Sequence, residues 1–116
     1  MPTDTVILSL VFLVSGLVLG AVAEAARRGR LRRNNWVGIR TAAVMRSEAA
    51  WLSGHRAAAP WLFLAALGPV ACGVALPFLP GGVVTVVALI SVLWVLALLV
   101  FGAARASTEA QTHRPG

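Results

Sequence analysis

The chain has 116 residues, 59% of them apolar and only 12% charged, and its formal net charge is +6. An average soluble domain has about 25% charged residues, so this composition excludes an ordinary soluble protein. All ten basic residues are arginine, and in so apolar a chain they indicate the positive-inside rule of membrane topology rather than a nucleic-acid partner.

The low charge reflects three apolar stretches, each long enough to cross a bilayer, since about 20 helical residues match a hydrocarbon core of about 30 Å. The sequence therefore predicts an all-α integral membrane protein with a single domain over residues 1–116. The predicted parts are spans over about 6–26, 57–79 and 83–104, a basic cytoplasmic loop with an interfacial amphipathic helix over 27–56, and a loose tail over 105–116.

The first span is preceded by the acidic residue Asp4 and followed by arginines, whereas a secretory signal peptide has its positive charge before the apolar segment. We therefore expect the N-terminus of this span to lie outside and the span to stay uncleaved. Gly16 and Gly20 form a GxxxG pattern, which favours close helix packing, either within the chain or in a dimer. Glu24 follows on the same stripe. It is expected to pair with Arg28 one turn later, or else with Arg40 or His55.

A basic cluster follows the first span, with five arginines in seven residues: Arg27, Arg28, Arg30, Arg32 and Arg33. Arginines at this place suit anionic lipid headgroups, at about 1 kcal/mol each near the surface. The alternative is a topological anchor without a specific ligand.

The loop then continues through the stretch 34–41. Gly38 predicts a turn that needs a positive φ or leaves no room for a Cβ. Thr41 is a plausible N-cap for a helix over about 42–56. At spacings of three and four, one face of that helix would carry Val44, Glu48, Trp51, Leu52 and His55. We expect this helix to lie under the cytoplasmic leaflet, with the indoles of Trp36, Trp51 and Trp61 at the headgroup level.

In the second span, Pro60 falls in the expected first turn and Gly68-Pro69 predicts a kink. Gly68, Cys72 and Ala75 form a small-residue stripe suited to close helix contact. A tight outer hairpin at 77–82 leads to the third span, where Trp94 is expected to be wedged between helices.

The arginine count fixes the predicted orientation. The 27–56 loop holds eight arginines, the tail holds Arg105 and Arg114, and the outer segments hold none. The N-terminus is therefore expected outside and the C-terminus in the cytoplasm. Arginine-only, alanine-rich usage is typical of bacterial GC-rich coding, which suggests the bacterial plasma membrane.

The pattern Asn35-x-x-Gly38-Ile39-Arg40-Thr41, followed by Ser47-Glu48, Trp51 and His55-Arg56 between two spans, resembles the SdpI family. Founding members of that family are bacterial membrane proteins that give immunity to a secreted toxic peptide and relay its presence by holding a transcriptional repressor at the membrane. The chain departs from the family pattern at Ala42, where proline is frequent, and at Met45, where a small polar residue is common. It also lacks the extra spans of larger members.

We expect no enzyme and no metal or other cofactor, because the few His, Cys and acidic residues are scattered on both sides of the membrane. Asn35, Gly38, Arg40, Thr41, Glu48, Trp51 and His55 form the candidate site, as a structural motif or a protein-docking surface. Arg40 could form a charge-assisted fork with Glu48 or Glu24.

The predicted partners are anionic lipids and a second protein at the cytoplasmic face or in the membrane. The predicted function is that of an immunity factor or signal relay acting by protein contacts. The alternative is an accessory subunit of a larger membrane complex, which the GxxxG pattern and the small extramembrane mass favour.

Overall fold

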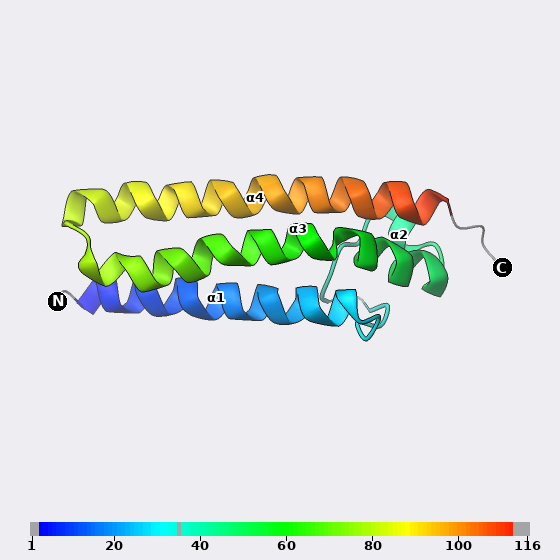
Figure 1. The fold of residues 1–116 in the computed structure, drawn as a ribbon, viewed down its shortest axis with the longest axis horizontal. Coiled ribbons are helices and arrows are strands. Elements are labelled where there is room, and N and C mark those ends of the chain that lie inside the picture. Colours follow the sequence, from blue (N-terminus) through cyan, green and yellow to red (C-terminus); the bar gives the residue numbers. More distant parts are fainter. Residues whose placement is uncertain (1–2, 35, 113–116) are drawn as a thin grey trace.

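The computed structural model describes residues 3–34 and 36–112. Its elements are α1 (Thr3–Arg27), α2 (Ala42–Met45), α3 (Glu48–Ala75), the 3₁₀ helix η1 (Leu76–Phe78) and α4 (Gly81–Gln111). Together they form a rod of 56 × 20 × 19 Å, in which α3 lies between α1 and α4 and packs along both (Figure 1). In the described part of the chain, three helical segments are long and apolar enough to cross a membrane, which confirms the predicted three-span, all-α architecture.

The segment 42–56 is not one helix, as the sequence predicted. α2 ends at Met45, and Ser47 takes an extended conformation with a φ of −156° before α3 begins. The Ser47 hydroxyl accepts a hydrogen bond from the Ala50 N–H over 3.1 Å and so caps the new helix. α3 then continues without a break to Ala75, which places Pro60 inside the helix rather than in its first turn. The predicted separate surface helix over 42–56 is therefore wrong, because residues 48–56 belong to the same helix as the second span. The residue at which that helix enters the membrane stays a prediction.

The third helix continues further than predicted. α4 remains helical to Gln111, so residues 105–111 do not form the loose tail that their polarity suggested. Ala106 and Ala110 are completely buried in the same hydrophobic cluster as residues of α2 and α3. A Cβ added to Gly54 of α3 would lie 2.9 Å from the Ala106 carbonyl oxygen, so the two helices approach here almost backbone to backbone. Residues 113–116 lie outside the described part of the chain.

α1 ends in a Schellman motif at Gly29. The Gly29 N–H donates to the Ala26 carbonyl over 3.3 Å, and the Arg30 N–H donates to the Ala25 carbonyl over 2.8 Å. Gly29 has a φ of +70°, a left-handed conformation that residues with a Cβ rarely adopt. The chain therefore reverses at the end of the first span, and the next residues return to α3.

The predicted GxxxG pattern is used inside the chain. A Cβ added to Gly16 would lie 2.6 Å from a side-chain carbon of Val70 and 2.9 Å from its backbone nitrogen. A Cβ added to Gly20 would meet Ala66 at 3.8 Å, an ordinary contact distance. Both glycines thus face α3, and Gly16 is the closer of the two contacts.

Gly68 makes room for Trp94 between α3 and α4. A Cβ added to Gly68 would lie 2.3 Å from Cδ1 of the indole. The Trp94 indole N–H donates to the Leu64 carbonyl over 2.8 Å. Trp94 thus contacts α3 as expected, although it is not enclosed between the helices, because 44% of it is exposed.

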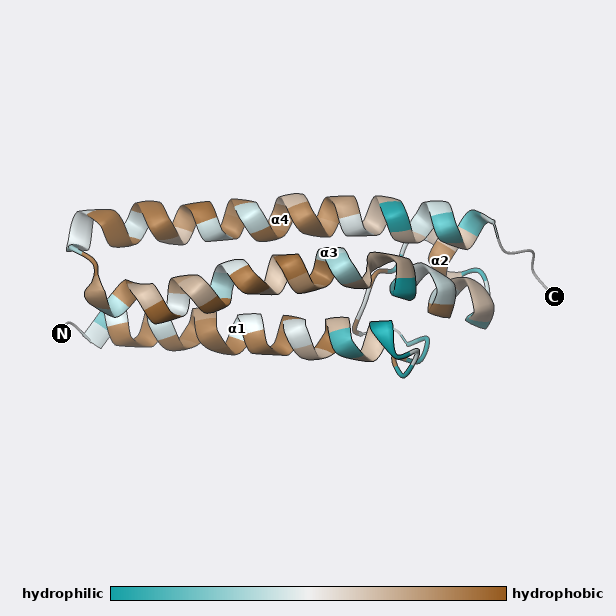
Figure 2. Ribbon diagram, in the orientation of Figure 1, coloured by the Kyte–Doolittle hydropathy of each residue, from teal (hydrophilic) through white to brown (hydrophobic). Residues whose placement is uncertain are grey.

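Polar residues gather at one end of the rod (Figure 2). This end, which we call the loop end, comprises the end of α1, residues 28–41, α2, the start of α3 and the end of α4. There α3 and α4 extend beyond the end of α1 (Figure 1).

Candidate functional site

The chain between α1 and α2 forms a loop over residues 29–41 that is bonded to both α3 and α4. We call it the docked loop. It contains most of the predicted motif, although Asn35 lies outside the described residues. What docks it is a pair of aromatic side chains on α3, Trp51 and His55.

Trp51 and His55 lie one helical turn apart, and their ring centroids are separated by 4.1 Å. Trp51 is 0% exposed and His55 is 1% exposed. The Trp51 indole N–H donates to the Leu31 carbonyl over 2.7 Å, so it holds the first half of the loop. The prediction that Trp51 keeps its N–H in the wet headgroup region is therefore wrong, because the protein itself supplies the acceptor.

His55 holds the second half of the loop. Its Nε2 accepts a hydrogen bond from the Ile39 N–H over 2.9 Å, and its Nδ1 lies 2.8 Å from the Trp51 carbonyl oxygen. Since Nε2 accepts, the proton of the neutral ring is on Nδ1, which donates to the Trp51 carbonyl. Both ring nitrogens are thus occupied by backbone groups, and His55 acts as a structural bridge.

Gly38 has the positive φ and the crowding that the sequence predicted. Its φ is +112°. A Cβ added there would lie 2.6 Å from His55 Nε2 and 3.2 Å from two carbons of the Trp51 ring. Glycine is therefore required for the backbone conformation and also for the close approach of the loop to the two rings.

Thr41 ends the docked loop and ties it to α4. It is the N-cap of α2, as predicted, although α2 has only four residues. Its hydroxyl accepts from the Val44 N–H at 3.4 Å and shares a 2.7 Å hydrogen bond with the Ser107 hydroxyl. The loop is therefore attached to both long helices of the loop end.

Asn34 shapes the tip of the loop, a role that the motif analysis missed. Its Oδ1 accepts from the N–H groups of Trp36 and Val37, each at 2.7 Å, and its Nδ2 donates to the Arg32 carbonyl over 2.7 Å. Such an Asx turn is a known use of asparagine ahead of a glycine turn, so the sequence did contain the signal. The turn presents Trp36, whose side chain is 89% exposed.

The arginines of the loop end have different surroundings. Arg33 donates to the Met45 carbonyl over 3.2 Å, and Arg46 donates to the Ala110 carbonyl near the end of α4 over 2.7 Å. A guanidinium there complements the partial negative charge of a helix C-terminus.

At the end of α1, Glu24 pairs with Arg27 and with Arg28. The predicted pair of Glu24 with Arg28 is thereby confirmed. Arg30 and Arg32 are exposed. The headgroup role of the cluster stays a prediction.

The remaining motif residues lie on the surface. Glu48 is exposed in the first turn of α3, where the positive end of the helix dipole favours a carboxylate. Arg40 is exposed in the docked loop. The predicted docking face of Arg40, Glu48, Trp51 and His55 thus divides into two exposed and two buried members. The buried members position the loop, whereas Arg40 and Glu48 are exposed.

Comparison with known proteins supports the resemblance in the motif. A model of the SdpI/YfhL protein family matches residues 30–104. The match includes most of the docked loop, all of α2, α3 and η1, and most of α4, while α1 precedes it. Neither the curated proteins nor the solved structures include a match to this chain. Since the family model covers more than half of the sequence and includes the residues that build the docked loop, the chain belongs to the SdpI/YfhL protein family.

Proposed function

We propose that this membrane protein acts through protein contacts at its loop end, as an immunity factor against a secreted toxic peptide, as a membrane signal relay, or as both. The observation that carries the proposal is the docked loop. Buried Trp51 and His55 fix the loop backbone, and Trp36 and Arg40 are exposed on the loop. Tryptophan and arginine are among the residues most enriched in protein-binding hot spots.

We further propose that the loop end faces the cytoplasm of a bacterial cell. Eight of the ten arginines lie between residues 27 and 56, and cytoplasmic segments accumulate arginine. In this orientation a soluble regulatory protein could reach the loop.

A non-catalytic role fits the same geometry. The two ring nitrogens of His55 are occupied by the Ile39 N–H and the Trp51 carbonyl, so in the docked state both serve structural hydrogen bonds. Glu48 is exposed and lies outside the buried pair.

The immunity branch is tested by expressing the chain in a bacterium that a secreted toxic peptide kills. Wild-type protein should raise survival. Gly38→Ala should abolish protection, because the added methyl group meets His55 and Trp51. Gly82→Ala is the matched control, since nothing lies within 4 Å of that Cβ. If wild type gives no protection at normal expression, the immunity branch is wrong.

The relay branch needs a different measurement. A photo-crosslinking residue at Arg40 or Trp36 should capture a soluble protein in intact cells, and exposure to the toxic peptide should change the yield. The same probe at Leu17, an exposed position on α1 outside the docked loop, is the control. Equal capture from both positions would contradict a specific docking surface.

An accessory subunit of a larger membrane complex is the second candidate. The small residues that suggested packing against another protein are used within the chain. Gly16, Gly20 and Gly68 all face neighbouring helices of the same chain. What still favours it is α4, which exposes large apolar side chains such as Leu93 and Val100. Recovery only as a monomer or homodimer in mild detergent would argue against this candidate.

A further inference from the structure

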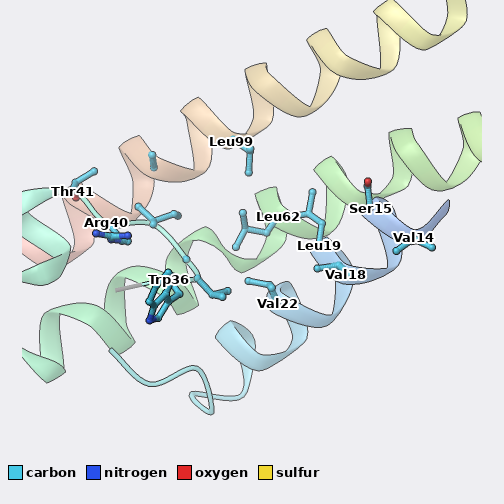
Figure 3. Close-up of a pocket in the computed structure, with 14 residues that line it drawn as sticks. Val14, Ser15, Val18, Leu19, Val22, Trp36, Arg40, Thr41, Leu62 and Leu99 are labelled. Atoms are coloured by element: carbon cyan, nitrogen blue, oxygen red, sulfur yellow. The ribbon is translucent and has the colours of Figure 1, made fainter. Parts of the chain in front are cut away.

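A groove runs between α1 and α4, with α3 as its floor. Its larger part, a cavity of about 870 Å³, lies next to the docked loop, and a second part of about 390 Å³ continues toward the η1 end. Ser15 and Leu19 line both parts, so the two form one elongated site. We call it the α1/α4 groove. Figure 3 shows its larger part, with Leu62 at the floor and Leu99 on the α4 side.

The groove has one polar end. Along its length the walls are almost entirely apolar, from Val14, Val18 and Val22 of α1 to Leu99 of α4. At the loop end it is closed by residues 36–41 of the docked loop, and Figure 3 shows the Arg40 guanidinium at this end. The site is thus long, apolar and terminated by a cation.

We propose that the α1/α4 groove binds an anionic glycerophospholipid, with an acyl chain between α1 and α4 and the phosphate at Arg40. The charge distribution matches such a molecule, since basic pockets between membrane helices bind anionic headgroups and a guanidinium can donate two hydrogen bonds to one phosphate. Trp36 beside Arg40 adds an indole, the side chain most typical of the headgroup level.

Lipid can also reach the groove from the side. Val14 and Val18 on its α1 wall are each 57% exposed, and α1 is apolar along its whole transmembrane length. A second copy of this chain fits less well. In a parallel arrangement it would bring a second arginine-rich loop end against the first, and like charges repel. The proposal goes beyond the proposed function, since it requires no protein partner.

The experiment measures which lipid the full chain retains. Protein is reconstituted into nanodiscs of equal parts palmitoyl-oleoyl-phosphatidylglycerol and palmitoyl-oleoyl-phosphatidylcholine, and its bound lipids are counted by native mass spectrometry. Wild type should retain one phosphatidylglycerol in preference to phosphatidylcholine. Arg40→Gln should lower that preference about fivefold, the effect of one arginine near an anionic surface. Arg40→Lys should restore part of it.

A second variant tests the apolar part of the site without changing charge. Val18→Trp fills the groove and should remove retained lipid of either kind, whereas Leu17→Trp, on a residue that lines neither cavity, should not. Arg32→Gln controls for the loss of an exposed arginine outside the groove. Circular dichroism confirms that each variant is folded.

Three results would overturn the proposal. The first is equal retention of the two lipids by wild type, and the second is an equal loss of retained lipid in the Val18→Trp and Leu17→Trp variants. The third is a wild-type dimer that Val18→Trp dissociates, which would mean that a second copy fills the groove. None of these results changes the toxin-survival experiment, so the two proposals fail separately.

Discussion

The backbone N–H of Ile39 donates a hydrogen bond of 2.9 Å to Nε2 of His55, sixteen residues further along the chain. This bond joins the docked loop to the helix that forms the centre of the bundle. It also requires the neutral imidazole, because a protonated Nε2 has no lone pair to accept with.

Replacing His55 by Phe should release the second half of the loop. The phenyl ring retains most of the packing volume but leaves the Ile39 N–H without its acceptor, at a cost of about 1–3 kcal/mol. Amide hydrogen exchange at Ile39 and Arg40 should accelerate, while amides in the middle of α3 should not change. The exposed neighbour Arg56→Ala is the control, and acceleration there to the same degree would contradict a specific role of His55.

Acidification should weaken docking in the same way. Protonation of His55 places a hydrogen on Nε2, so the docked state is favoured at neutral pH and is lost as the pH falls far enough to protonate the ring. Because burial lowers the pKa of the His55 imidazole, a spin label at Val37→Cys, in a Cys72→Ala background, should become more mobile only as the pH falls below the ordinary histidine range. His55→Gln, which cannot titrate in this range, should remove the change. Persistent pH dependence in that variant would assign the effect to another group.

Gly38→Ala should destabilise the loop end more than any glycine substitution in open space. A positive φ costs a residue with a Cβ about 1–3 kcal/mol, and the methyl group would also meet His55 Nε2 at 2.6 Å. The midpoint of thermal unfolding in detergent should fall for this variant and stay constant for Gly82→Ala. Equal midpoints would mean that the loop can leave α3 without cost.

The two glycines of the GxxxG pattern should respond differently. Gly16→Ala places a Cβ 2.6 Å from the Val70 side chain and should separate α1 from α3, whereas Gly20→Ala makes only a 3.8 Å contact and should be tolerated. Resistance of the chain to unfolding by sodium dodecyl sulfate measures the difference. If both substitutions instead reduce dimer formation equally, the pattern serves association between chains.

Gly68 and Trp94 should be energetically coupled. Gly68→Ala alone should be destabilising, because its methyl group would lie 2.3 Å from the indole, and Trp94→Leu should relieve most of that cost. Trp94→Phe should cost about 0.6–1.7 kcal/mol through loss of the hydrogen bond to the Leu64 carbonyl. A double-mutant cycle on unfolding free energies checks the coupling, and additive effects would contradict it.

The sequence predicted the features that depend on local chemistry. Continuous apolar runs predict membrane spans, the spacing of Glu24 and Arg28 predicts their ion pair, and Gly38 and Thr41 predict a turn and a helix cap. Each of these follows from a residue and its near neighbours.

The features that the sequence did not predict depend on contacts between distant segments. Polar residues at 105–111 suggested a loose tail, but Ala106 and Ala110 are buried against α2 and α3. Trp51 was expected at the lipid surface, but the Leu31 carbonyl, twenty residues earlier in the chain, takes its N–H. The motif spacing predicted that these residues act together, whereas only the fold separates the buried side chains of Trp51 and His55 from the exposed side chains of Arg40 and Glu48.

The unbroken course of α3 has a consequence for access. With 28 residues it is about 42 Å long, whereas the hydrocarbon core is about 30 Å thick. If α3 stands along the membrane normal, roughly two of its turns lie outside the hydrocarbon core. These turns would support the docked loop. A soluble protein that approaches from the aqueous side would then reach the raised end of α3 first, whereas a molecule that diffuses within the lipid layer would reach α1 or α4 first.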